Sequence, residues 1–218
     1  MTELESLYAA IKICPDCDLC KTRTRAVPGE GSPNAEMMFV GEGPGFNEDQ
    51  QGRPFVGAAG KFLDELLVSI GTQRSEVYIT NVLKCRPPNN RDPLPNEVEA
   101  CRKYLLRQIE LIKPRLIVTL GRFSLAWFFP RDAIGKAHGQ LRRLGDQHFY
   151  HVYHPAAALH AGNLRKVIQE DFARIPAALA KAREAQAQAQ AVAVAVGAGA
   201  GMARSAVTDP PPEQMRLL

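Results

Sequence analysis

Apolar residues recur along this chain with two different spacings, and each spacing predicts one type of element. Short runs of consecutive apolar residues, rich in Val, Ile, Leu and Phe, predict buried strands. Apolar residues three and four positions apart predict amphipathic helices. The runs predict strands at residues 36–40, 77–82, 116–120 and 149–153, and the wider spacing predicts helices at residues 3–13, 57–70, 95–112, 123–129 and 164–179.

The order of these elements, in which short apolar strands alternate with helices, predicts an α/β fold. We expect a three-layer αβα sandwich with a short, mainly parallel central sheet. Ligands of such sheets bind beyond the carboxyl ends of the strands. A polar or glycine-rich motif follows each predicted strand here: GEGPG, then Asn81, Gly121 and His154. Loops are polar in most proteins, so the argument for a site depends on all four motifs meeting at one edge.

The composition changes near Lys181. The segment EAQAQAQAVAVAVGAGAG has low complexity, and the last residues, SAVTDPPPEQMRLL, are polar and rich in proline. Neither segment has enough apolar surface to pack as a folded unit. We therefore expect one folded domain at residues 1–180 and a disordered tail at residues 181–218.

Charge and composition narrow the class of partner only slightly. Lys and Arg total 27 against 23 for Asp and Glu, which gives a formal net charge of +4. This excess permits a polyanionic partner without requiring one. The first residues lack the pattern of a secretory signal, and no apolar run approaches the roughly 20 residues of a membrane span. We expect a cytoplasmic monomer with no membrane partner.

Five cysteines are the clearest candidates for metal chemistry. Cys14, Cys17 and Cys20 form C-x2-C-x2-C, while Cys85 and Cys101 follow much later. Free cysteines are often small buried hydrophobic residues, but the first two lie in a polar loop, where that interpretation fits poorly. In a reducing compartment such a set indicates metal or redox chemistry rather than disulfides. Four thiolates suit zinc and a [4Fe–4S] cluster equally, and spacing alone does not identify the fifth, spare cysteine.

Three motifs, in this order, resemble a family 4 uracil-DNA glycosylase: GEGPGFNEDQQGRPFVGAAGKFLDELL, VYITNVLKCRPPNNRDPLPNEVEAC and HPAAALH. The resemblance covers residues 14–179. It implies a DNA repair enzyme that flips uracil out of single- or double-stranded DNA and hydrolyses its N-glycosidic bond, leaving an abasic site. It also implies a 4Fe–4S cluster rather than zinc. The implied ligands are Cys14, Cys17, Cys85 and Cys101.

The resemblance assigns three residues to the uracil base. Phe55 stacks on the base, although its commonest role elsewhere would be a core residue. Asn81 reads the uracil edge, because one amide can pair with N3–H and O4 together and mismatches cytosine; a turn asparagine is the alternative. His154 donates to uracil O2 as negative charge develops; a surface histidine before a proline-led helix is the alternative.

The GEGPG segment and the residues after it supply the remaining candidates for the site. Its glycines let the backbone approach the substrate. A phosphate cradle is the alternative, but neither G-x-G-x-x-G nor a P-loop is present. Gly43 stands where better-known uracil glycosylases carry an aspartate. Of the nearest carboxylates, we favour Glu42 for orienting water or stabilising the sugar cation, and Glu48 for excluding the thymine methyl.

Several residues are candidates for contacting DNA. Cations flank the cysteines and are candidates for phosphate contacts, with a merely solvated charged surface as the alternative. Leu159 is the expected apolar wedge. The family often has a basic residue at the position of His160. A related branch of this family captures uracil covalently through a histidine in an extended loop near Cys85. The corresponding loop here, PPNNRDPLP, holds no histidine, which predicts turnover rather than covalent capture of uracil. No lysine is expected in the pocket itself to form a Schiff base, although Lys61 and Lys84 lie nearby in sequence, which predicts no lyase step. The cations are Lys21, Arg23, Arg25, Lys84, Arg86 and Arg91.

Two other classes of function fit part of the sequence. One is a nucleic-acid-binding protein stabilised by a metal and without catalysis, and the other is a redox-sensing iron–sulfur protein. The expected partner in our interpretation is uracil-containing DNA. A sliding-clamp partner is not readable from the sequence.

Overall fold

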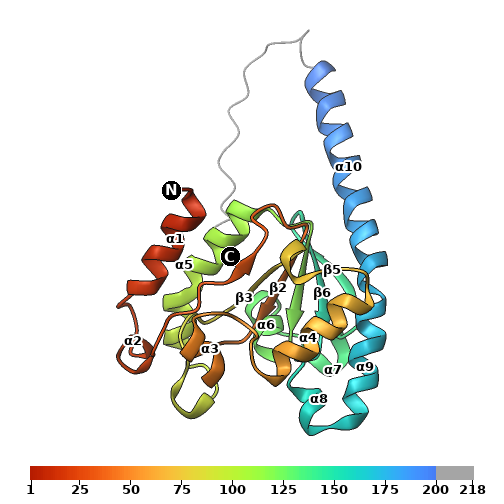
Figure 1. Ribbon diagram of the computed structural model, residues 1–218. Coiled ribbons are helices and arrows are strands. Elements are labelled where there is room, and N and C mark those ends of the chain that lie inside the picture. Colours follow the sequence, from red (N-terminus) through yellow and green to blue (C-terminus); the bar gives the residue numbers. More distant parts are fainter. Residues whose placement is uncertain (200–218) are drawn as a thin grey trace.

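The computed structural model describes residues 1–199, and its centre is a six-stranded sheet with the order β1-β3-β2-β4-β6-β5 (Figure 1). The inner strands, which run parallel, are β3 (Tyr78–Asn81), β2 (Met37–Gly41), β4 (Leu116–Leu120) and β6 (Gln147–Val152). They are the four strands that the apolar runs predict. The edge strands β1 (Glu30–Gly31) and β5 (Leu141–Leu144) pair antiparallel and were not predicted, because neither contains an apolar run.

Helices cover both faces of the sheet, because alternate residues of each strand point to opposite faces. Phe39 packs in a core with α4 (Ala58–Ser69), α9 (Gly162–Ala173) and the start of α10 (Ile175–Gly199). Its neighbours Met38 and Val40 pack in a second core. The helices of that core are α1 (Glu3–Ile13), α5 (Pro95–Ile112) and α6 (Arg122–Phe128). The predicted three-layer αβα sandwich is therefore confirmed.

Local signals set the ends of α5. The helix begins at Pro95, which needs no hydrogen-bond partner for a backbone N–H at that position. The Glu97 carboxylate accepts a hydrogen bond from Leu94 N at 2.9 Å. The helix ends before Lys113, whose backbone is left-handed, with φ +51°. Pro114 follows and prevents the helix from continuing.

The predicted helix at residues 164–179 is two helices. Helix α9 ends at Ala173 and α10 begins at Ile175, with Pro176 in its first turn. Proline lacks a backbone N–H and clashes with the preceding turn, so a new helix starts here. Helix α10 extends past the domain boundary predicted at residue 180. The remainder of the predicted tail, residues 200–218, lies outside the described residues.

Six short helical segments complete the described chain. Within residues 1–199, no helix is long and apolar enough to cross a membrane. The short segments are α2 (Leu19–Thr22), α3 (Phe46–Gln51), η1 (Arg74–Glu76), η2 (Pro88–Asn90), α7 (Ile134–Ala137) and α8 (Ala157–His160).

Candidate active site

The carboxyl ends of β2, β3 and β6 lead into one cavity of about 300 Å³. All six residues that the sequence suggested for a pocket line it: Glu42, Gly43, Glu48, Phe55, Asn81 and His154. The other lining residues are Pro44, Gly45, Ala59, Pro87, Asn90, Arg91 and Ala156. The meeting of several strand-end motifs at one edge of the sheet is what a parallel sheet predicts for its ligand site.

Asn81 offers this cavity an amide with unused hydrogen-bonding capacity. The residue is 2% exposed, and its Oδ1 has no partner among the described residues. A Cβ atom on Gly41 would lie 2.4 Å from that oxygen, so glycine is needed beside it. Buried polar atoms are normally paired, because an unpaired one costs free energy. The unpaired Oδ1 is therefore available to a ligand that donates a hydrogen bond from within the cavity.

The Phe55 ring forms one wall of the cavity. The ring lies almost parallel to that of His154, with 5.5 Å between centroids and 25° between planes. A Cβ atom on Gly41 would lie 2.7 Å from the edge of the Phe55 ring. The aromatic face, the Asn81 amide and the imidazole are thus within reach of one small planar molecule.

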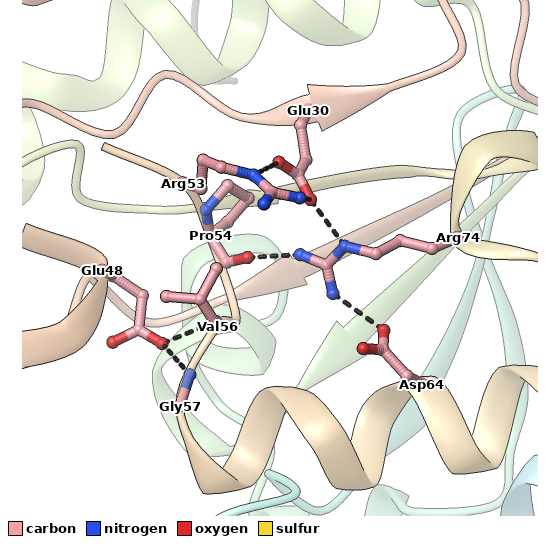
Figure 2. A network of polar contacts seen from close by, with 8 residues as sticks. All are labelled: Glu30, Glu48, Arg53, Pro54, Val56, Gly57, Asp64 and Arg74. Carbon is pink, nitrogen blue, oxygen red and sulfur yellow. Dashed lines mark hydrogen bonds and ion pairs between the residues drawn. The ribbon is translucent and has the colours of Figure 1, made fainter. Parts of the chain in front are cut away.

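Glu48 braces the loop that carries Phe55 (Figure 2). Its Oε1 accepts hydrogen bonds from Val56 N at 2.9 Å and Gly57 N at 3.0 Å, and its Oε2 accepts one from Gly45 N at 3.1 Å. Both oxygens are therefore occupied by backbone donors. Glu48 forms part of the cavity wall, and these bonds leave it poorly placed to activate water.

The tautomer of His154 follows from the turn that contains it. Ala156 N donates a hydrogen bond to Nδ1 at 3.1 Å, so Nδ1 is an acceptor. In a neutral imidazole the proton is then on Nε2. Burial lowers the pKa of His154 to about 4, so the ring is neutral at pH 7. His154 lines the cavity as a neutral side chain with one N–H to donate.

Glu42 is a cavity carboxylate whose pKa is strongly shifted by its surroundings. Burial and the nearby charge of Asp92 raise the pKa of Glu42 to about 7, and Arg122 opposes them. Arg122 and Asp92 form an exposed ion pair at 2.6 Å. A carboxyl group with a pKa near 7 can accept a proton at neutral pH, as a general base must. The next residue, Gly43, contributes backbone only.

Four cysteines lie in one apolar cluster between α1, α5 and the segment after β3. Cys14, Cys85 and Cys101 are buried and Cys17 packs against them. Cys20 is absent from this cluster, and its Sγ lies 3.8 Å from Pro15 O. The fold thus separates Cys14, Cys17, Cys85 and Cys101 from Cys20. Spacing alone did not identify the spare one.

The thiols of this cluster are not arranged around a single ion. Within residues 1–199, no group of three or more His, Cys, Asp or Glu side chains is suited to hold one metal ion. Arg23 donates to Cys85 Sγ at 3.2 Å and to Cys14 O at 2.9 Å. Burial raises the pKa of Cys101 to about 11, so without a cation this thiol stays protonated. Four thiols from one cluster can in principle hold either zinc or an iron–sulfur cluster.

The prediction that Lys84 contacts phosphate is wrong, because its side chain is 1% exposed. Its Nζ donates three hydrogen bonds of 2.7 Å, to Thr80 Oγ1, Asn81 O and Gln108 Oε1. Arg23 is also turned inward, toward the cysteines. The remaining candidate cations, Lys21, Arg25, Arg86 and Arg91, are exposed or half-exposed.

Sequence reasoning missed several residues that line the cavity. Pro87 and Asn90 belong to the loop after Cys85, and Arg91, considered only for phosphates, lines the cavity while bound to Glu97 at 2.6 Å. The signal was available, because this loop follows β3 and therefore starts at the same edge of the sheet. The bracing role of Glu48 had no sequence signal, since its backbone partners are distributed over residues 45–57.

Comparisons with known proteins agree with this geometry. A sequence model described as the uracil DNA glycosylase superfamily matches residues 28–175. The type-4 uracil-DNA glycosylase of Archaeoglobus fulgidus is 50% identical over 184 residues, which cover 80% of this chain and 92% of that protein. Its counterpart in Sulfurisphaera tokodaii is 50% identical over 185 residues, covering 80% and 84%. The counterpart in Thermotoga maritima is 43% identical over 183 residues, covering 82% and 95%.

Proposed function

The chain belongs to the uracil DNA glycosylase superfamily, and from this premise we propose how its cavity excises uracil from DNA. Similarity to type-4 uracil-DNA glycosylases extends over most of the chain, and the protein is a DNA repair glycosylase that removes uracil. The roles of individual residues, the use of water and the iron–sulfur cluster are our proposals. The observation that supports them best is the unpaired Asn81 amide beside the Phe55 ring and the neutral His154.

Recognition depends on Phe55 and Asn81. A uracil flipped out of the stack loses stacking and pairing, which costs a few kcal/mol that the cavity must offset. Phe55 supplies a new stacking surface, and the Asn81 amide pairs with uracil N3–H and O4. Cytosine presents the opposite donor and acceptor pattern, so it would leave the buried amide unsatisfied. Glu48 narrows the cavity beside these groups and excludes the larger thymine.

His154 stabilises the leaving group. As the glycosidic bond breaks, negative charge develops on the departing uracil, and Nε2–H donates to its O2. A neutral donor held in place before the reaction needs little rearrangement as the charge appears. The bond from Ala156 N to Nδ1 fixes both the tautomer and the ring orientation.

Glu42 interacts with the positive charge that develops on the sugar. The sugar becomes an oxocarbenium-like cation, which an ionised carboxylate stabilises. The same carboxylate can orient the attacking water and accept its proton, for which a pKa of about 7 is suited. The products are free uracil and an abasic site, with the oxygen of water on the sugar carbon.

The reaction is monofunctional. A lyase step requires an amine that forms a Schiff base with the opened sugar. No lysine lines the cavity within the described chain, and the Lys84 amine is buried against Asn81 O, Thr80 and Gln108. Water is therefore the nucleophile, and the strand is not cut by the enzyme.

The proposed cofactor is a [4Fe–4S] cluster bound by Cys14, Cys17, Cys85 and Cys101. These four thiols come from separate segments of the chain and lie together in one apolar cluster, which fits this group. Cys20 lies outside that cluster. The cluster would cross-link three parts of the chain rather than take part in excision. A broad visible absorption that disappears on treatment with an iron chelator would identify it, whereas bound zinc without colour would contradict it.

The decisive experiment uses an oligonucleotide that carries one uracil. The protein should generate alkali-labile sites at that position, and identical strands with thymine or cytosine should remain intact. Asn81→Ala should lower the excision rate by about 100-fold or more, because the base edge loses its partner. Asn34→Ala, an exposed asparagine outside the cavity, should leave the rate unchanged. An unaltered rate in Asn81→Ala would contradict the assigned role.

A further inference from the structure

Phe55 has a backbone conformation that needs outside support. Its φ is +52°, in the left-handed region that residues with a side chain seldom adopt. Such a conformation is energetically unfavourable and persists only where surrounding contacts enforce it. The same backbone sets the direction of the ring that forms the cavity wall. Whatever enforces this conformation therefore positions the stacking surface.

Contacts on both sides of Phe55 enforce it (Figure 2). After Phe55, Val56 N and Gly57 N donate to Glu48 Oε1. Before Phe55, Pro54 O accepts a hydrogen bond from an Arg74 Nη2. The carbonyl of Phe55 itself packs on α4, where a Cβ atom on Gly60 would lie 1.9 Å from it.

Arg74 is itself held by two carboxylates from different elements. Its Nε donates to Glu30 Oε1 at 2.5 Å, in β1, and its Nη1 donates to Asp64 Oδ1 at 2.9 Å, in α4. Burial raises the pKa of Glu30, but hydrogen bonds from Arg53 and Arg74 outweigh it and the net pKa is lowered. The guanidinium thus has a distinct partner for each of its three nitrogens. Its planar geometry makes this arrangement rigid.

We propose that Arg74 is a positioning residue for uracil excision, which acts by holding the Pro54 carbonyl so that the Phe55 ring faces the cavity. Arg74 does not line the cavity and lies on the opposite side of the Phe55 loop from Glu48 (Figure 2). Removing it frees one side of a strained backbone, which can then relax and turn the ring. The inference rests on the proposed stacking role of Phe55.

Arg53 provides a matched control within the same network. It also binds Glu30, with Nε at 2.7 Å from Oε2, but it makes no hydrogen bond to Pro54 O. Its side chain is 58% exposed, against 20% for Arg74. Substitution of either arginine removes one positive charge and its hydrogen bonds to Glu30, two from Arg53 and one from Arg74. Only substitution of Arg74 releases the Phe55 loop.

The test is a double-mutant cycle on single-turnover excision of uracil, measured with Arg74→Gln, Phe55→Ala and the combined variant. Arg74→Gln should lower the rate about 10- to 100-fold, the scale that displacement of a positioning group produces. Arg53→Gln should remain near the wild-type rate. In the Phe55→Ala background, Arg74→Gln should cause no further loss, because the residue through which it acts is absent.

Each other outcome has a distinct meaning. Equal multiplicative losses with and without Phe55 would overturn the inference, because Arg74 would then act elsewhere. A normal Arg74→Gln beside an impaired Phe55→Ala would also overturn it while leaving the stacking role intact. A normal Phe55→Ala would remove the stacking role itself. If Arg74→Gln does not fold, Arg74→Lys replaces it in the same cycle, since a single nitrogen cannot occupy the three positions from which the guanidinium nitrogens donate.

Discussion

At the scale of single residues, the cavity separates two titrating groups by their surroundings. Burial lowers the pKa of His154 to about 4 and raises that of Glu42 to about 7. His154 is therefore neutral over the whole range in which Glu42 gains or loses its proton. A uracil anion meets a neutral donor, and the sugar cation meets a carboxylate whose charge depends on pH.

We predict that excision rises with pH through about 7, because only ionised Glu42 stabilises the cation and accepts a proton. Below that pH the single-turnover rate should fall about tenfold per unit. Glu42→Gln should be slow at all pH values and lose this dependence. Glu65→Gln, an exposed residue of α4, should keep the wild-type profile. A wild-type profile in Glu42→Gln would contradict the assignment.

The same group affects stability with the opposite sign. The pKa of Glu42 is higher in the folded protein than in the unfolded chain, so folding favours its protonated form. Its contribution is fully present below the ordinary pKa of 4.5 and is lost as pH rises from there to about 7. The free energy of unfolding of Glu42→Gln, relative to wild type, should therefore increase between about pH 4.5 and about pH 7 and stay level above that.

At the scale of elements, sequence patterns predict some of the helices and strands and miss others. The four inner strands and the long helices follow from apolar spacing. Strands β1 and β5 do not, because Glu30–Gly31 is too short for any period and LRRL places cations at half its positions. The break between α9 and α10 had a signal in Pro176, which the apolar period outweighed.

Lys84 joins two elements, β3 and α5, through its bonds to Thr80, Asn81 O and Gln108. We predict that Lys84→Met lowers the free energy of unfolding by about 1–3 kcal/mol, since it leaves buried acceptors unpaired. Denaturant unfolding measures this loss. Lys61→Met, at an exposed position of α4, should change stability little. Equal stability of the two variants would contradict the structural role of Lys84.

The turn and short helix α8 place Leu159 at the surface, where it is 47% exposed. We predict that Leu159→Ala slows excision from double-stranded DNA about tenfold and leaves single-stranded DNA unaffected, because only the duplex must be opened. Val68→Ala, which removes an exposed apolar residue from α4, is the control. Equal losses on both substrates would argue against a wedge.

At the scale of the whole molecule, the segment of residues 81–85 connects the two functional parts. Asn81 lies at the cavity, Lys84 anchors the segment, and Cys85 lies in the thiol cluster with Cys14 and Cys101. The N-terminal helix, the loop after β3 and α5 thus meet at one point. We therefore expect that loss of a cross-link between these three parts would also disturb the position of Asn81 in the cavity.

We predict that removal of the proposed iron–sulfur cluster by a chelator increases hydrogen exchange in residues 3–25 and in the loop after β3, while the core around α4 and α9 stays protected. Cys17→Ser should reproduce this behaviour and lose the visible absorption. Cys20→Ser should retain both colour and protection. A fully protected N-terminal segment in the iron-free protein would contradict the cross-link.

How much of the site was predictable also depends on this scale. Asn81, His154 and the GEGPG segment stand at or directly after the predicted strands, so the pattern of apolar runs is enough to predict that they belong to the site. The brace around Phe55 does not, because Glu30, Pro54, Asp64 and Arg74 meet only after β1, α4 and η1 have packed. Lys84 was misassigned for the same reason, since charge along the chain does not reveal which cation turns inward.

The turn at residues 154–156 fixes the tautomer of its own imidazole. Enzymes commonly fix a histidine tautomer with a second side chain from elsewhere in the fold, but here the amide two residues downstream does so. Grafted onto the end of a strand in another scaffold, the same turn would fix which ring nitrogen carries the proton without a supporting carboxylate. The ring would stay uncharged only where the scaffold also buries it, because burial is what lowers the pKa of His154 here.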